Sequence, residues 1–186
     1  MTDLADRGAG AVDDTDAVDL ILADHEEMER LLRLLRDDTQ DRVAVRAELA
    51  DLLVAHAEAE EDVVYPVLER QADAEGEDDV EDEVEHGEEE HAEINEALLA
   101  VLELDDLDGD EFTEALEELG EMVHHHLSEE ERNVLNPARE LVEPDRRREV
   151  GASFLGARRG ILASSPGSLA NVRGLVEEAR AEGLLD

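Results

Sequence analysis

Apolar residues recur at alternating steps of three and four along four long stretches of the chain. This spacing is typical of helices that bury one stripe of side chains. The connecting segments, such as DDTQD and DDLDGD, are short and polar. Long helices joined by short connections lie antiparallel to their neighbours, so the sequence predicts an all-α, up-down-up-down four-helix bundle. The predicted helices cover residues 15–36, 41–71, 79–104 and 111–141.

Two prolines lie inside the predicted bundle helices, Pro66 in the second and Pro137 in the fourth. Proline has no N–H to donate, and its ring clashes with the preceding turn. We therefore expect each helix to kink or loosen near its proline.

Three regions follow from these patterns. Residues 1–15 are small and acidic and are predicted to be a disordered tail. Residues 16–142 form the bundle, and residues 143–186 form a helical extension. Within the extension, Pro144 suits the first turn of a helix that ends near Ala163, SSPGS breaks the pattern, and a last helix covers about 169–182. We expect the extension to pack on the bundle or on a second subunit, forming a homo-oligomer.

The charge of the chain is strongly one-sided. There are 55 acidic residues against 16 basic ones, all arginine, for a formal net charge of -39. Self-repulsion on this scale opposes a compact state at low ionic strength, whereas molar salt screens it over a few ångströms. The composition predicts a halophilic protein; an acidic protein from an ordinary cytoplasm is the alternative. Nucleic acid and anionic membranes would repel the chain and are not expected as partners.

Other classes of protein are excluded by what the sequence lacks. Without cysteine there are no disulfides, thiolate metal sites or cysteine nucleophiles. No secretory signal is visible in the first residues, and no apolar stretch approaches membrane-spanning length. We therefore expect a soluble, cytoplasmic protein.

Ionisable residues interrupt all four apolar stripes. Each stripe carries one histidine, and two stripes carry a glutamate one turn further on. These residues are His25, His56, Glu60, His91, His126 and Glu130. Glutamate is so common here that its spacing from histidine means little, but the stripes select four histidines from seven. A satisfied core histidine is the alternative for any single one. Four of them with two carboxylates in register are better explained by a metal cluster, because buried ionisable groups need compensation.

The types of ligand atom narrow the choice of metal. Imidazole and carboxylate without thiolate suit iron, manganese or zinc. Two carboxylates among four helices favour two ions over one. These ligands offset only part of the charge of two divalent ions, so water, hydroxide or oxide must supply the rest. That leaves a place for a small exogenous ligand.

Four segments at these positions resemble the hemerythrin-like, or HHE cation-binding, family across about residues 18–140. They are ADHEEMERLL, HAEAEEDVVYPVL, EEEHAEINEALL and HHHLSEEERNVLNPAR. The resemblance implies a non-haem di-iron centre with Glu60 and Glu130 as bridging carboxylates and the four stripe histidines as terminal ligands.

The chain departs from this family at one position. Oxygen-carrying hemerythrins have two histidines four apart on the third helix, whereas Gly87 stands four residues before His91. His86, Glu61 and Glu88 are candidates for the missing ligand. The functional prediction is a di-iron protein that binds or senses dioxygen, peroxide, nitric oxide or iron. An open site could instead make it an enzyme that disproportionates peroxide or reduces nitric oxide. The remaining alternative is a purely structural metal site.

Overall fold

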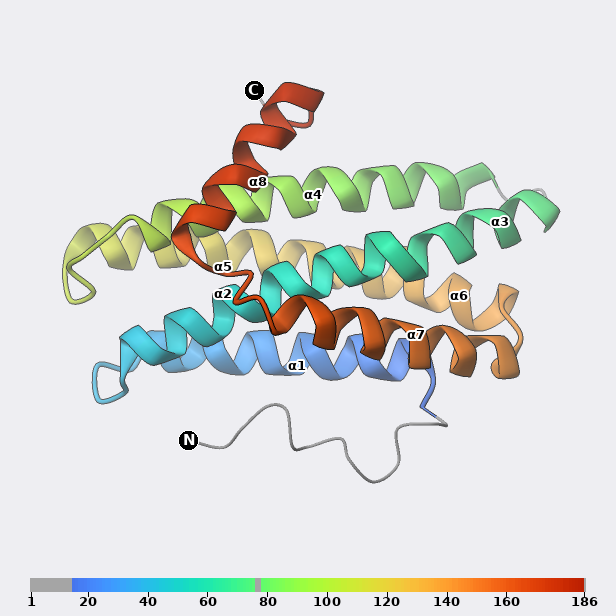
Figure 1. Cartoon of the computed structure of the whole chain (residues 1–186), viewed down its shortest axis with the longest axis horizontal. Helices are drawn as coiled ribbons and strands as arrows, with labels where there is room; N and C mark the ends of the chain where they lie inside the picture. Colours follow the sequence, from blue (N-terminus) through green and yellow to red (C-terminus); the bar gives the residue numbers. More distant parts are fainter. Residues whose placement is uncertain (1–14, 76–77, 186) are drawn as a thin grey trace.

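The computed structural model describes residues 15–75 and 78–185, and within these ranges the chain is all-α (Figure 1). Its elements are α1 Ala17–Leu35, α2 Arg42–Ala59, the π-helical turn η3 Glu60–Val64, α3 Tyr65–Glu75, α4 Asp78–Leu102, α5 Asp110–Glu130, the π-helical turn η4 Glu131–Leu135, α6 Asn136–Leu141, α7 Pro144–Leu162 and α8 Leu169–Glu182. The predicted all-α bundle is confirmed. The acidic tail predicted for residues 1–15 lies, but for its last residue, outside the described residues.

Four arms make up the bundle (Figure 1). They are α1, the run α2–η3–α3, α4, and the run α5–η4–α6. Aspartate side chains fix the starts of the first two arms. Asp16 Oδ1 accepts a hydrogen bond from the Val18 N–H at 3.0 Å, and Asp41 Oδ1 accepts one from the Ala44 N–H at 3.1 Å.

The second and fourth arms each contain one π-helical turn. In η3 the Tyr65 N–H donates to the Glu60 carbonyl five residues earlier, and in η4 the Asn136 N–H donates to the Glu131 carbonyl. Each turn begins six residues before its proline. A proline ring cannot sit over a regular preceding turn, so the helix widens there. The loosening predicted near both prolines therefore takes the form of a π turn.

Two apolar clusters fill the bundle, one on either side of a polar layer. The cluster nearer the α1–α2 connection contains Leu35, Leu49 and Phe112, and the other contains Ile21 and Tyr65. The buried histidines and glutamates of the four stripes lie between them. Burial of both clusters drives folding and places the polar layer at mid-bundle.

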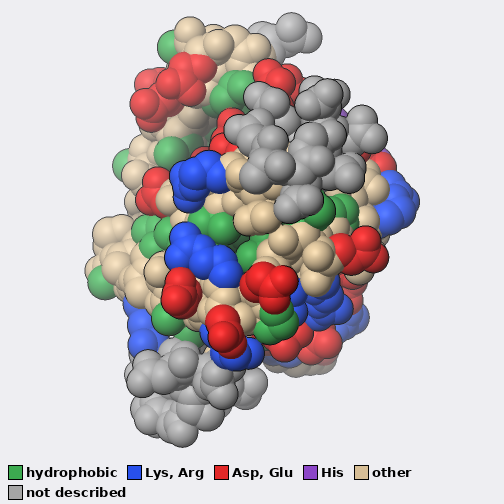
Figure 2. Space-filling model, turned by 90° about the vertical axis from the view of Figure 1, so that its right-hand side faces the viewer, with side chains coloured by type: hydrophobic (Ala, Val, Ile, Leu, Met, Phe, Trp, Pro, Cys, Tyr) green, Lys and Arg blue, Asp and Glu red, His purple; other side chains and the backbone are tan. Residues whose placement is uncertain are grey.

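The C-terminal helices pack on the bundle. In Figure 1, α7 runs alongside α1 and α2, and α8 crosses α4. Arg147 Nε donates to Asp16 Oδ2 at 2.7 Å, and the Gly167 N–H donates to Asp51 Oδ1 at 2.8 Å. Figure 2 shows that arginine and acidic side chains are interspersed on the end of the molecule that faces the viewer. The extension therefore packs on three of the four arms, through contacts of α7 with α1 and α2 and of α8 with α4.

Among the described residues, no helix combines the length and apolar character needed to cross a lipid bilayer.

Candidate metal centre

All four arms contribute to one buried site at mid-bundle. The six side chains that the sequence singled out are buried there, none more than 5% exposed: His25, His56, Glu60, His91, His126 and Glu130. Their position follows from the helical stripes, because residues four apart lie on one face. The structure therefore brings together the whole set selected from the sequence.

One half of the site contains two histidines and both glutamates. His25 Nε2 lies 3.1 Å from Glu130 Oε2, and His56 Nε2 lies 3.1 Å from Glu60 Oε2. One ligand atom from each of the four residues lies within 4.8 Å of all the others. This spacing can hold one metal ion.

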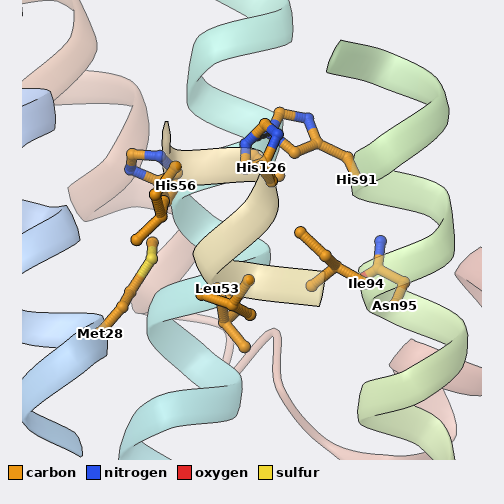
Figure 3. A pocket seen from close by; sticks show the side chains of 10 residues that line it. Met28, Leu53, His56, His91, Ile94, Asn95 and His126 are labelled. Atoms are coloured by element: carbon orange, nitrogen blue, oxygen red, sulfur yellow. Dashed lines mark hydrogen bonds between the residues drawn. The ribbon is translucent and has the colours of Figure 1, made fainter. Parts of the chain in front are cut away.

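The other half shares Glu60 with the first. Glu60, His91 and His126 also offer ligand atoms within 4.8 Å of one another. His91 Nε2 lies 3.1 Å from His126 Nε2 and 3.6 Å from Glu60 Oε2. Figure 3 shows His91 and His126 turning their rings toward each other from α4 and α5. This group could hold a second ion with three protein ligands, where the first group offers four.

A ring of four outer carboxylates orients the histidines. Each histidine directs Nδ1 at a carboxylate from another arm. The pairs are Asp24 with His56 at 3.4 Å, Glu61 with His91 at 2.8 Å, Glu90 with His126 at 2.9 Å, and Glu131 with His25 at 3.0 Å. An ionised carboxylate only accepts hydrogen bonds, so each Nδ1 donates to its carboxylate and each Nε2 is directed into the site. Carboxylate–histidine pairs of this kind support metal ligands.

The outer carboxylates are sequence neighbours of the six buried side chains described above, which we call the inner residues. Asp24 and Glu90 directly precede His25 and His91, and Glu61 and Glu131 directly follow Glu60 and Glu130. Each one serves a histidine on the next arm, so the contacts close a ring around the bundle. Sequence reasoning offered Glu61 as a ligand and missed the other three. Acidic residues are so frequent that this adjacency carries no signal.

Unpartnered polar atoms show that the site fits metal ions. Both carboxylate oxygens of Glu60 and of Glu130, together with Nε2 of His25 and of His56, have no hydrogen-bond partner among the described residues. Nε2 of His91 and Nε2 of His126 also face each other at 3.1 Å. Buried polar groups left in this state cost several kcal/mol, and cations between them would remove the cost. The nitrogen and oxygen donors suit iron, manganese or zinc.

The pKa shifts of the inner residues also indicate that the site lacks positive charge. Burial raises the pKa of Glu60, and the negative charge of Glu130 raises it further. Burial lowers the pKa of His56, but the charge of Glu60 and a hydrogen bond to Asp24 outweigh it and raise the pKa to about 10. Burial also lowers the pKa of His126, and there it outweighs the hydrogen bond to Glu90, which raises the pKa. Without metal, a proton on His56 therefore supplies part of the missing charge.

The C-terminal extension reaches the site through α7. Arg158 Nη2 donates to Asp24 Oδ1 at 2.7 Å, and its Nε lies 2.6 Å from Oδ2 as an ion pair. The Phe154 ring meets the His56 ring edge-on, with centroids 6.1 Å apart. Arg158 therefore holds the aspartate that orients His56. Nothing in the sequence pattern linked this arginine to the site.

The remaining ligand candidates lie outside the two buried groups. His86 is exposed, and its Nε2 lies 3.8 Å from Glu90 Oε1 and 3.7 Å from Glu129 Oε2, in a third, shallower group. Glu88 is exposed and belongs to none of the three groups found among the described residues. Glu61 is the outer partner of His91.

A small cavity adjoins the histidines, and Figure 3 shows Met28, Leu53 and Ile94 among the side chains that line it. Its volume is about 10 Å³, close to that of one water-sized sphere. His56, His91 and His126 form one wall, and most of the rest is apolar, including Met28 and Ile94. Only a very small molecule can sit beside the site without moving side chains.

The chain is similar to known hemerythrin HHE proteins both in sequence and in fold. The sequence model of the Hemerythrin HHE cation binding domain matches residues 16–138, which include all six inner residues. A crystal structure of a Hemerythrin HHE cation binding domain-containing protein from Mycobacterium kansasii superposes with a TM-score of 0.70 at 20% identity, covering 86% of this chain and 98% of that chain. At this identity the likeness shows a shared fold. A comparison with curated proteins finds no significant match.

Proposed function

Because the chain belongs to the hemerythrin HHE cation-binding domain family, we propose that its buried site holds two iron ions and binds a small ligand. The ligand classes are dioxygen, peroxide and nitric oxide, with iron itself as the alternative cargo. Hemerythrin domains bind metal ions, usually iron. The observation that carries the proposal is the pair of buried ligand groups sharing Glu60.

Each residue has a role in this proposal. His25, His56 and Glu130 would hold one ion, His91 and His126 would hold the other, and Glu60 would serve both. Glu130, the second bridging carboxylate that the family resemblance implies, lies in only one of the two buried ligand groups found among the described residues. The outer carboxylates keep the imidazoles in the tautomer that offers Nε2 to the metal. A pair of irons supplies ligand binding and redox chemistry when bound.

The proposed ligand is small because the protein leaves little room. The half that contains His91 and His126 has three protein ligands, so it keeps more open coordination positions than the other half. The six residues of the site are at most 5% exposed, so bulk water and large molecules cannot reach them unless side chains move. The bundle thus favours a diatomic molecule or peroxide.

The three-residue half also favours a second candidate function, turnover of peroxide or reduction of nitric oxide. Open positions next to a redox-active metal allow reaction as well as binding. Peroxide decay faster than with free iron, abolished in His126→Ala, would support an enzyme. Decay at the rate of free iron would leave binding as the function.

We also propose that the protein works in molar salt, as a haloarchaeal-type acidic member of the family. The support is the net charge of -39 and the use of arginine for every basic residue. Strong screening reduces the self-repulsion of the acidic bundle.

Glu60→Gln tests the shared site directly. The substitution keeps the shape of the side chain but removes the charge that both halves use. We expect the purified variant to contain less than half the iron of the wild type, with both positions weakened. Glu88→Gln is the control, because Glu88 is exposed and outside the three groups found in the described ranges. Full iron content in Glu60→Gln would refute the shared position.

A further inference from the structure

Tyr65 is a buried polar residue that the metal ligands leave unexplained. Its side chain has an exposed fraction of 0%, and its hydroxyl has no hydrogen-bond partner within the described part of the chain. A buried hydroxyl normally finds a partner, because leaving it without one is costly. The tyrosine is therefore positioned for a partner that does not belong to the protein.

The hydroxyl lies next to the half of the site with three protein ligands. The rings of Tyr65 and His91 are stacked, with centroids 6.0 Å apart and planes 4° from parallel. A Cβ at Gly87 would lie 2.9 Å from Tyr65 Oη. Gly87 precedes His91 by one helical turn on the same face of α4. The phenol thus fills the space that a side chain at position 87 would occupy.

The chemistry of a phenol sets its role. It keeps its proton at neutral pH and donates one hydrogen bond. The nearby carboxylates, those of Glu130 and Glu60 above all, oppose a further negative charge beside them. A neutral donor suits an oxygen or nitrogen atom of a small ligand, which carries partial negative charge when a metal holds it.

We propose that the Tyr65 hydroxyl donates a hydrogen bond to the small ligand held at the Glu60–His91–His126 half of the site. This inference rests on the proposed function. It identifies Tyr65 as the residue that favours ligands able to accept a hydrogen bond, and it assigns the ligand to the Gly87 side of the site. The cavity of Figure 3 lies on the other side of His91, among Met28, Leu53 and Ile94.

The test uses the iron-loaded, full-length protein with azide as the probe. Tyr65→Phe removes the hydroxyl and keeps the ring. We expect unchanged iron content and a dissociation constant for azide, from optical titration, about three- to tenfold higher than in the wild type, the range of one hydrogen bond.

Gly87→Ala provides a matched second variant. Its new Cβ pushes against Oη, so azide binding should weaken when Tyr65 is present. In Tyr65→Phe the clashing atom is absent, and the remaining contact with Cζ at 3.4 Å is an ordinary one. We therefore expect Gly87→Ala to have no further effect in that background. Equal, additive effects in both backgrounds would contradict the assigned position of the hydroxyl.

The outcomes separate this inference from the proposed function. Azide binding of equal strength in wild type and Tyr65→Phe overturns the inference and leaves the proposed function standing. Failure of the iron-loaded wild type to bind azide overturns both. Loss of iron, or of a visible phenolate-to-iron absorption band, in Tyr65→Phe overturns the inference by making Tyr65 a metal ligand.

Discussion

Arg158→Ala tests whether α7 supports the metal centre. The guanidinium lies 2.6 Å from Asp24, and the two side chains are 13% and 11% exposed. Its removal leaves the aspartate with one weaker contact, to His56 Nδ1 at 3.4 Å. Breaking a fully buried ion pair costs about 3–5 kcal/mol. Because this pair retains some exposure, we expect the free energy of unfolding to fall by about 2–3 kcal/mol.

Chemical and thermal unfolding followed by circular dichroism measure this loss. For a chain of this length, the loss corresponds to a melting temperature lower by about 5–10 °C. Arg159→Ala is the matched control, since Arg159 is the exposed neighbour on the same helix. Surface substitutions of that kind change stability by about 0.5 kcal/mol or less.

The same variant should also weaken metal binding. An aspartate without its arginine holds His56 less firmly, and loss of such outer partners costs about 10- to 100-fold in metal affinity. Replacing the stranded charge in Arg158→Ala/Asp24→Asn should recover part of the stability but none of the affinity. Wild-type stability and metal affinity in Arg158→Ala would refute the role given to α7.

Three further predictions concern packing, salt and pH. Gly167→Ala should destabilise the protein by about 1–3 kcal/mol in urea unfolding, because a Cβ at Gly167 would lie 2.3 Å from the backbone of Ala50; Gly174→Ala, with no atom within 4 Å among the residues described, should not. Transfer from molar salt to dilute buffer should lower the melting temperature, and a melting temperature indifferent to salt would contradict the proposed salt adaptation. Metal binding at neutral pH should release protons, because the pKa of about 10 keeps His56 protonated in the metal-free protein. The affinity for metal should therefore rise with pH up to that value. Calorimetric heats of binding that do not depend on the buffer would contradict the release of protons.

The sequence predicts the fold and the inner residues of the site for the same reason. A buried stripe at helical spacing is visible in one dimension, so a histidine on it, such as His91, stands out against apolar neighbours. The bundle and the convergence of all six residues follow from that pattern alone. The π turns were only partly predictable. Pro66 and Pro137 indicate that the helix is distorted nearby, but they do not specify whether the distortion is a kink or a π turn.

The outer parts of the site depend on contacts between arms. Asp24, Glu90 and Glu131 look like any other acidic residue of this chain until the bundle places them against histidines of another arm. Arg158 is more than 130 residues away from Asp24 in sequence. Tyr65 belongs to a recognisable segment, but its unpartnered hydroxyl and its fit against Gly87 are properties of the packed structure.

The metal centre that we propose is one buried site that is shared through Glu60 and holds two metal ions. Its most direct test is the iron content per chain of untagged protein purified in high salt, with optical spectra before and after exposure to oxygen. We expect two irons per chain and near-ultraviolet bands that change on oxidation. One zinc ion, or no metal and no colour, would contradict it and leave the six inner residues as a structural network.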